Sequence, residues 1–219
     1  MFFWLILTGM KEFDTYLFDF DGTLVDSYES LVKVFSGAYS KVGVKVPEGY
    51  TLRLMRCPLY VGYEELHGPD DENSKKIFGD EIVRLLNDEE VLKATKTYEE
   101  VKDTLIELVN RGKKLGIVTS NSKTHVRDVL GFIGLDESLF SIIVGNEATK
   151  KHKPNPDPIL KGLELLGINK TGVCYVGDAL DDMRCAINAE VTPILVDRLN
   201  EHGDVCKLTI YKLDELLKY

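Results

Sequence analysis

Hydrophobic and polar residues alternate with two different periods along most of the chain. Short apolar runs bounded by turn residues predict strands, and apolar residues that recur every three or four positions predict helices. The predicted strands are Asp14–Phe20, Lys114–Thr119, Ser141–Gly145, Val173–Gly177 and Thr192–Val196. Helices are predicted between them, beginning near Glu99, Val126, Pro156 and Asp181. This order predicts an α/β fold with a Rossmann-like, doubly wound parallel sheet covered by helices on both faces.

The stretch from residue 26 to residue 95 has a different pattern. Helical stripes such as Leu31, Val34, Phe35 and Ala38 fill it, and strand-like runs are nearly absent. We therefore predict an α/β core domain of residues 11–25 and 96–219, interrupted by a helical cap domain of residues 26–95. Residues 1–10 (MFFWLILTGM) are expected to form an apolar N-terminal extension. It makes a poor signal peptide because no basic segment precedes it, and Met10 stays open as an alternative start.

The composition is that of an ordinary globular protein, with 44% apolar and 29% charged residues. A net charge of −9 argues against nucleic acid and anionic membranes as partners. No apolar run approaches the roughly 18 residues of a membrane span. The four cysteines, which lack CxxC spacing, predict reduced thiols in a cytoplasmic protein; they are Cys57, Cys174, Cys185 and Cys206. The oligomeric state stays open.

Two acids, Asp19 and Asp21, lie at the carboxyl end of the first predicted strand, and Asp21 is joined to Gly22. In an α/β sheet, ligands bind in the crevice outside the carboxyl ends of the strands. Gly22 lets the main chain approach a ligand closely and present its N–H group. A surface Asp-Gly turn is the alternative explanation of this pattern.

Polar residues also follow the second predicted strand, where Thr119, Ser120 and Asn121 offer hydroxyl, amide and main-chain N–H groups to phosphate oxygens. Capping of the next helix is the alternative. Further along, Lys153 lies in a proline-stiffened loop (KPNP) and supplies a compact positive charge for a phosphate, unless it is an ordinary surface lysine.

A last acidic group follows the strand Val173–Gly177. Asp178, Asp181 and Asp182 place three carboxylates within five residues. Hard oxygen ligands in a tight turn suit Mg²⁺. A favourable interaction with the helix dipole is the alternative, although it requires fewer acids.

The order of these four groups resembles the motifs of the haloacid dehalogenase superfamily. They are Asp19-Phe20-Asp21-Gly22-Thr23, then Thr119, then Lys153-Pro154, then Gly177-Asp178 through Asp182. The resemblance extends from Lys11 over nearly the whole chain. The K-P-x-P spacing and the helical insert after the first motif resemble the phosphoglycolate phosphatase branch.

The resemblance implies a Mg²⁺-dependent phosphohydrolase that acts on a small phosphorylated metabolite. Asp19 would be the nucleophile that forms an aspartyl phosphate, and Asp21 the general acid and base. The implied metal residues are Asp19, Asp21 through its main-chain carbonyl, Asp178 and, farther out, Asp182. The implied phosphate-binding residues are Gly22, Thr119, Ser120, Asn121 and Lys153. Asp181 competes with Asp182 for the outer metal role, although the G-D-x-x-x-D count favours Asp182.

Other functions remain open at this stage. A phosphomutase of the β-phosphoglucomutase type shares the four motifs, but residues 52–66 lack the serine of its R-x-x-S-L cap segment. A pyrophosphatase is a further alternative, as is a non-catalytic module that binds phosphorylated ligands. Two mutually repelling acids argue against the last. In the cap, Arg53 and Arg56 are candidates for binding an acidic leaving group. The alternative is that they are ordinary solvated arginines on the surface of a cap helix.

Overall fold

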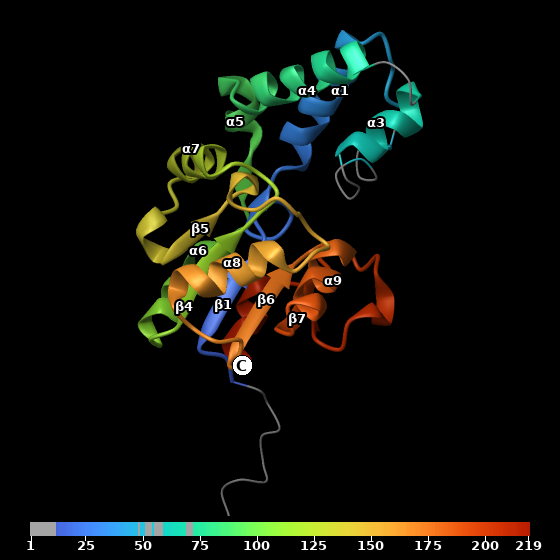
Figure 1. Cartoon of the computed structure of the whole chain (residues 1–219). Coiled ribbons are helices and arrows are strands. Elements are labelled where there is room, and N and C mark those ends of the chain that lie inside the picture. Colours follow the sequence, from blue (N-terminus) through green and yellow to red (C-terminus); the bar gives the residue numbers. More distant parts are fainter. Residues whose placement is uncertain (1–11, 48, 51–53, 55–58, 69–71) are drawn as a thin grey trace, which may run out of the picture. The chain divides into compact units, whose positions relative to one another are not determined.

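The structure is a computed structural model that describes residues 12–47, 49–50, 54, 59–68 and 72–219 (Figure 1). The predicted N-terminal extension, Arg53, Arg56 and Cys57 lie outside the described residues.

The chain divides into two compact units. The first contains the described residues up to Leu24 together with Tyr98–Lys123 and Ser138–Tyr219, and the second contains Val25–Thr97 and Thr124–Glu137. The limits at Leu24 and Thr97 lie close to those that the sequence predicts for a cap. The grouping of Thr124–Glu137 with the helical unit was not expected from the sequence, and the division into core and cap domains stays a prediction.

The first unit is built on a six-stranded parallel sheet with the strand order β5-β4-β1-β6-β7-β8. The strands are β1 (Thr15–Phe18), β4 (Lys114–Val118), β5 (Ile142–Val144), β6 (Val173–Gly177), β7 (Thr192–Val196) and β8 (Thr209–Ile210). The chain first builds outward from β1 on one side and then on the other, so the order reverses between β1 and β6. This arrangement confirms the predicted doubly wound sheet and places its topological switch point between β1 and β6.

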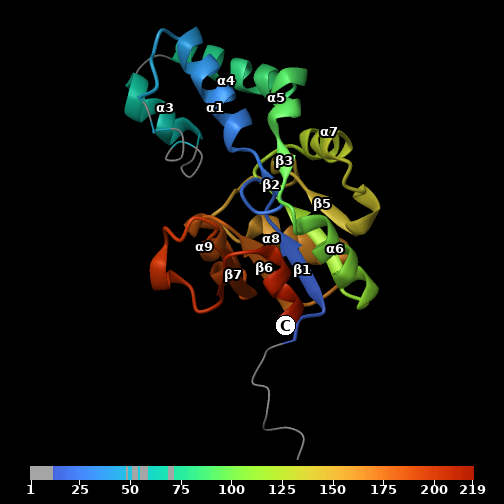
Figure 2. The ribbon, with the colours of Figure 1, turned by 180° about the vertical axis from the view of Figure 1, so that it is seen from behind.

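Helices cover both faces of this sheet (Figures 1 and 2). The helices of the first unit are α6 (Val101–Asn110), α8 (Asp157–Leu166) and α9 (Leu180–Asn188), with 3₁₀ turns at Glu137–Leu139, Asn146–Ala148, Gly203–Val205 and Leu213–Lys218. Side chains of α8 and α9 pack with Leu17, Val118 and Tyr175 in one core cluster. On the other face, α6 contacts the last 3₁₀ turn, and Tyr16 stacks with Phe18. Both faces of β1 are therefore buried, which explains its continuous apolar run.

The second unit is mainly helical and has its own core. Its elements are β2 (Val25–Asp26), α1 (Tyr28–Lys41), α3 (Leu59–His67), α4 (Glu72–Leu86), α5 (Glu89–Ala94), β3 (Lys96–Thr97) and α7 (Lys123–Ile133). Tyr39, Tyr63 and Phe78 form an aromatic centre in which Phe78 lies 4.7 Å and 4.9 Å from the two tyrosine rings. The chain enters this unit through β2 and leaves its main part through β3, and the two strands pair antiparallel.

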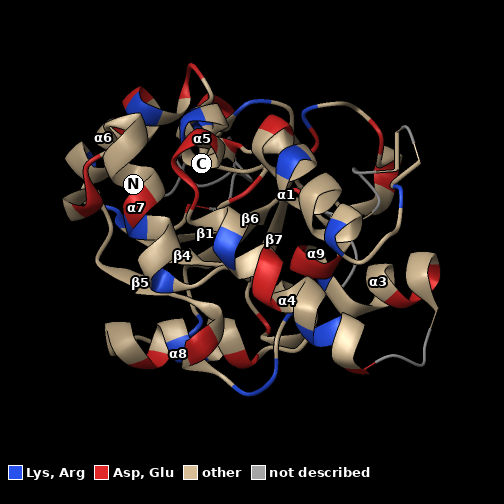
Figure 3. Ribbon diagram, turned by 90° about the horizontal axis from the view of Figure 1, so that it is seen from above, with Lys and Arg blue, Asp and Glu red and all other residues tan. Residues whose placement is uncertain are grey.

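Two further sequence predictions bear on the molecule as a whole. Among the described helices, none is long and apolar enough to cross a membrane. Cys174, Cys185 and Cys206 are free thiols, as expected. Acidic and basic residues alternate along exposed surfaces such as α8, where Lys161 pairs with Glu164 at 3.0 Å (Figure 3).

Candidate active site

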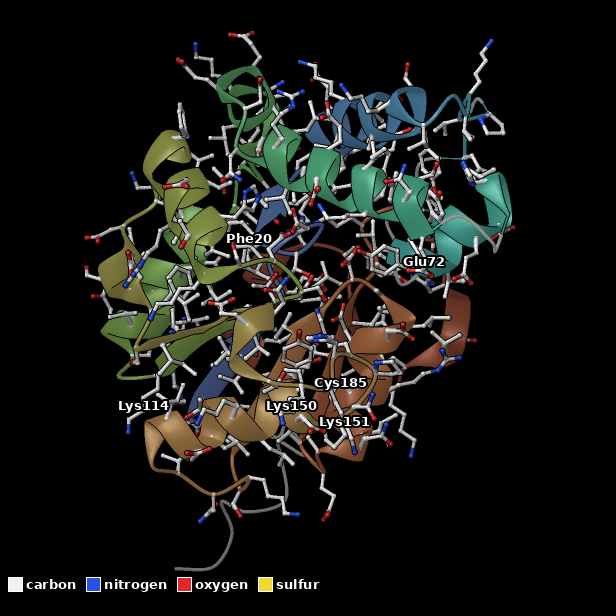
Figure 4. The ribbon with its side chains drawn as sticks, turned by 45° about the horizontal axis from the view of Figure 1, so that its top comes forward. Phe20, Glu72, Lys114, Lys150, Lys151 and Cys185 are labelled. Atoms are coloured by element: carbon white, nitrogen blue, oxygen red, sulfur yellow. The ribbon has the colours of Figure 1, made fainter. Side chains whose placement is uncertain are left out.

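The turn after β1 carries the first two candidate acids. The N–H of Asp19 donates to the carbonyl of Val176 at 2.8 Å, so Asp19 continues the pairing of β1 with β6. The chain then turns, closed by a 2.9 Å hydrogen bond from the Leu24 N–H to the Phe20 carbonyl. Phe20, labelled in Figure 4, is fully buried and anchors the turn. Gly22 has a φ of +75°, and a Cβ at this position would collide with the carboxylate of Asp178. A glycine is needed here both for the left-handed conformation and for the close approach.

Three carboxylates meet at the carboxyl ends of β1 and β6. Asp19, Asp178 and Asp182 each place one oxygen within 4.8 Å of the others. The ammonium of Lys153 joins them, with its Nζ 2.6 Å from Oδ1 of Asp19 and 2.7 Å from Oδ1 of Asp182. The loop before α8 thus brings a cation to acids from the turn after β1 and from α9. The side chains of Asp19 and Lys153 are each 9% exposed, so the two charges are largely removed from water.

The two adjacent acids of α9 have different surroundings. Asp182 is buried, and its Oδ2 accepts the N–H of Ala179 at the start of the helix at 3.0 Å. Gly177 makes room for it, because a Cβ at Gly177 would lie 2.5 Å from Cβ of Asp182. Asp181 instead pairs with Arg184 at 3.0 Å, outside the three-acid cluster. The geometry therefore favours Asp182 over Asp181 as the acid of the site.

Burial and mutual repulsion dominate the electrostatics of the cluster. Desolvation raises the pKa of Asp19 well above its ordinary value; Lys153 opposes this rise, and Asp182 and Asp178 add to it. Desolvation lowers the pKa of Lys153, but Asp182 and Asp19 outweigh it, so the net shift is upward. The lysine therefore stays protonated, and the cluster holds more acids than the single ammonium can neutralise.

Tyr175 is a member of the site that the sequence analysis missed. Its hydroxyl oxygen, buried beneath the cluster, lies 2.8 Å from the carbonyl of Val118 and 3.2 Å from Nζ of Lys153. A hydroxyl has one proton, which we assign to the nearer Val118 carbonyl, so the oxygen accepts from Lys153. All five residues of the strand Val173–Gly177 are buried. The sequence therefore gives no signal that distinguishes Tyr175 from its apolar neighbours.

The loop after β4 brings two further candidates to the first motif. The side-chain amide of Asn121 donates a short hydrogen bond to Oδ2 of Asp21, and its main-chain N–H donates to Oγ1 of Thr119 at 3.1 Å. Thr119 is buried, whereas Ser120 is exposed. Asn121 thus orients a catalytic candidate, which adds to the phosphate contact expected from the sequence.

Together these residues form a constellation suited to attack on phosphorus. A buried carboxylate, Asp19, stands beside a cation, and a second carboxylate, Asp21, is held separately by Asn121. The remaining acids are hard oxygen donors of the kind that bind Mg²⁺. Of the sequence-predicted residues in the described chain, Asp19, Lys153, Asp178 and Asp182 form one cluster, and Asn121 joins Thr119 to Asp21. Asp181 pairs with Arg184 instead, and Ser120 is exposed.

Sequence comparisons identify relatives over most of the chain. A family model described as haloacid dehalogenase-like hydrolase matches residues 16–196. A curated relative from Caldanaerobacter subterraneus subsp. tengcongensis, "Putative pyrophosphatase PpaX", is 33% identical over 181 residues, covering 82% of this chain and 80% of the relative. The phosphoglycolate phosphatase of Aquifex aeolicus is 29% identical over 176 residues, covering 79% of each.

The fold is also found among solved structures. A "Putative haloacid dehalogenase-like hydrolase from Bacteroides fragilis" superimposes with a TM-score of 0.84 at 24% identity, covering 94% of this chain and all of that chain. At this level of identity the likeness describes the fold alone.

Proposed function

Since the chain belongs to the haloacid dehalogenase-like hydrolase family, we propose that it is a Mg²⁺-dependent phosphohydrolase that cleaves small phosphate monoesters through an aspartyl-phosphate intermediate. The observation that carries the proposal is the position of Asp19, buried at the switch point of the sheet and 2.6 Å from the ammonium of Lys153. The relatives named phosphoglycolate phosphatase and pyrophosphatase support phosphate chemistry.

Asp19 performs the nucleophilic step in this proposal. Lys153 contacts Oδ1 and fixes the carboxylate, so Oδ2 attacks phosphorus while the bond to the leaving oxygen breaks. Water then attacks the phosphorus of the aspartyl phosphate, the P–Oδ2 bond breaks, and inorganic phosphate leaves. The carboxylate returns to its starting form, so the cycle is balanced.

Asp21 handles the protons in both steps. It donates a proton to the leaving oxygen in the first step and accepts one from water in the second. The short hydrogen bond from Asn121 holds its carboxyl group on the turn and supports this assignment. Such a group typically contributes about 10²–10⁴-fold to the rate.

The acid cluster fits a divalent cation by the chemistry of its donors. Asp19, Asp178 and the main-chain carbonyl of Asp21 would hold Mg²⁺, which would neutralise charge on the phosphoryl group. Asp182 would act from farther out, because its Oδ2 accepts the N–H of Ala179 and its Oδ1 accepts Lys153.

The remaining residues would bind the phosphoryl oxygens. We assign this role to the N–H of Gly22, to Thr119, Ser120 and Asn121, and to Lys153. The three N–H donors of Lys153 face Asp19, Asp182 and Tyr175 in this structure. A phosphoryl oxygen would replace one of these acceptors as the substrate enters. A role for Arg53 and Arg56 in binding an acidic leaving group also stays a proposal.

Hydrolysis of pyrophosphate is the second candidate. It is favoured by the relative named as a pyrophosphatase, whose identity of 33% exceeds the 29% of the phosphoglycolate phosphatase from Aquifex aeolicus. The same active-site chemistry serves both, since the leaving group is then phosphate in place of an alkoxide. Assays with phosphoglycolate, pyrophosphate and p-nitrophenyl phosphate, each with and without Mg²⁺, separate the two functions.

The proposal is tested by Asp19→Asn, with Asp181→Asn as the matched control. The amide is nearly isosteric but cannot act as a nucleophile, so Asp19→Asn should lose turnover on every substrate while its circular dichroism stays unchanged. Asp181→Asn removes a neighbouring acid outside the cluster and should keep near-normal activity. More than a few per cent of residual turnover in a clean Asp19→Asn preparation would exclude Asp19 as the nucleophile.

A further inference from the structure

Arg198, in the loop after β7, contacts the first-motif turn from outside the acid cluster. Its Nη2 donates to the carbonyl of Thr23 at 2.9 Å, and its Nε donates to the carbonyl of Gly22 at 3.3 Å. These two carbonyls belong to the turn that follows Asp21 directly. Main-chain carbonyls that are removed from water need hydrogen-bond donors. Arg198 supplies donors to two consecutive carbonyls of this turn.

The guanidinium is itself held from two further sides. Its Nη1 donates to Oε1 of Glu100 at 2.6 Å, and its plane lies over the ring of Tyr98 with Cζ 3.5 Å from the ring centre. The side chain of Arg198 is only 13% exposed. Glu100 also accepts the N–H of Leu213 at 3.1 Å. The planar fork of an arginine suits this set of contacts, and a lysine, as a point charge, could not make them together.

The loop that carries Arg198 is fixed as well. The buried carboxylate of Asp197 accepts the N–H groups of Glu201 and His202, both at 2.9 Å. In the same turn, Gly22 approaches Asp178 so closely that no side chain would fit. The turn with Asp21 is therefore contacted both by Arg198 and by the carboxylate of Asp178.

We propose that Arg198 is a positioning residue that fixes the position of Asp21 through its hydrogen bonds to the carbonyls of Gly22 and Thr23. This inference rests on the proposed function, in which Asp21 protonates the leaving oxygen. A general acid must lie within hydrogen-bond reach of the atom it protonates, and a displacement of about 1 Å can cost roughly 100-fold in rate. Arg198 therefore matters most for substrates whose leaving group needs that proton.

The test compares Arg198→Gln with wild type on two esters. p-Nitrophenyl phosphate has a leaving group that is stable as an anion, whereas an alkyl phosphate such as phosphoglycolate needs protonation. We expect Arg198→Gln to lower kcat/KM, which reports the leaving-group step and not the later attack of water, by about tenfold or more on phosphoglycolate and by less than about threefold on p-nitrophenyl phosphate. The ratio of the two rates does not depend on the fraction of folded enzyme, so partial unfolding cannot imitate this result.

Arg111 supplies a matched control at the other end of α6. It also pairs with a glutamate, Glu107, and donates to a main-chain carbonyl, that of Leu217 at 2.6 Å. Because it precedes β4, it lies at the edge of the sheet away from the acid cluster. Arg111→Gln should leave the ratio of the two rates unchanged. Glu100→Gln, which releases the anchor of Arg198 but keeps its carbonyl contacts, should change the ratio in the same direction as Arg198→Gln and by less.

Combination with Asp21→Asn separates the possible failures. In the Asp21→Asn background, Arg198→Gln should no longer change the ratio, because the acid that it positions is gone. Equal losses on both esters for Arg198→Gln, in an enzyme where Asp21→Asn discriminates between them, would overturn the inference and leave the proposed function standing. A wild-type enzyme inactive on both esters and on pyrophosphate would overturn the proposed function and this inference with it.

Discussion

The surroundings of Lys153 show how single atoms define the site. Each of its N–H groups faces an acceptor, and the three acceptors come from β6, α9 and the turn after β1. An ammonium group in water would exchange its hydrogen-bond partners freely. The ammonium of Lys153 is nearly buried, and its three acceptors fix the orientation of its N–H groups. A buried donor that loses its acceptor costs about 1–3 kcal/mol. The orientation of Lys153 is therefore sensitive to each neighbour.

Tyr175→Phe tests this orientation. The change removes one acceptor of Lys153 and the donor to the carbonyl of Val118, while the ring still fills its space. We expect the free energy of unfolding, measured in urea, to fall by about 1–3 kcal/mol and kcat to decrease. Tyr211→Phe, at an exposed tyrosine, should change neither quantity. Wild-type kcat and stability in Tyr175→Phe would show that the hydroxyl is dispensable.

The junction of β6 with α9 is the element that shapes the acid cluster. The strand ends at Gly177, Asp178 follows in the turn, and Asp182 lies one helical turn further on. Because the strand and helix approach each other closely here, the position of Asp182 depends on a missing side chain at Gly177.

Gly177→Ala should therefore displace Asp182 from Lys153. Overpacking of this kind typically costs about 1–3 kcal/mol of stability, and we expect weaker Mg²⁺ activation in addition. Gly131→Ala in α7 is the control, because a Cβ there meets open space. It should raise stability by about 0.5–1 kcal/mol, as alanine is the better helix former. Equal stability of the two variants would contradict a close approach at Gly177.

Glu100, at the start of α6, binds Arg198 in the loop after β7 and the N–H of Leu213 near the C-terminus. These contacts predict a dependence of stability on pH. Burial acts to raise the pKa of Glu100, but hydrogen bonds from Arg198 and the Leu213 N–H outweigh it, so the pKa is lowered from 4.5. A lowered folded-state pKa stabilises the protein above the unfolded value and loses this effect as the pH falls through the folded value.

Glu100→Gln should therefore lose stability near neutral pH and show a smaller further loss on acidification below about 4.5 than wild type does. Urea unfolding at a series of pH values measures both effects. Glu107→Gln, at an exposed glutamate that pairs with Arg111, is the control and should resemble wild type. Parallel curves for wild type and Glu100→Gln would mean that Glu100 titrates equally in the folded and unfolded states.

For the whole molecule, the family and the fold predicted from the sequence are confirmed. The match over residues 16–196 and the relatives named phosphoglycolate phosphatase agree with the resemblance seen in the motifs. The parallel sheet with order β5-β4-β1-β6-β7-β8 agrees with the predicted doubly wound core. The identity of the substrate and the requirement for Mg²⁺ are parts of the proposed function and stay predictions.

Metal binding should be visible as a change in global stability. A ligand that binds only the folded chain adds about 2.7 kcal/mol at 100 times its Kd. Mg²⁺ should therefore raise the Tm, and EDTA should reverse the rise. Asp178→Ala should reduce this effect, and the Mg²⁺ sensitivity of kcat, more than Asp182→Ala, because the oxygens of Asp182 are already hydrogen-bonded to Ala179 and Lys153. The reverse ranking would exchange the inner and outer roles of the two acids.

The sequence by itself predicted the order of the main strands and helices of the core and the acids of the candidate site. Buried parallel strands such as β1 and β6 must be continuously apolar, and polar residues that follow them must meet at one edge of the sheet. Short elements escaped prediction, because two-residue strands such as β2 and β8 have no hydrophobic period to read.

Only the tertiary structure decided which side chains touch. Asp181 and Asp182 are adjacent and chemically identical. The way in which α9 packs on the sheet decides that Asp182 contacts Lys153 in the cluster, whereas Asp181 pairs with Arg184. Tyr175 and Arg198 belong to no motif, and their contacts include Lys153, 22 positions from Tyr175, and Gly22, 176 positions from Arg198. Such contacts arise from the packing of distant segments, so no local pattern in the sequence records them.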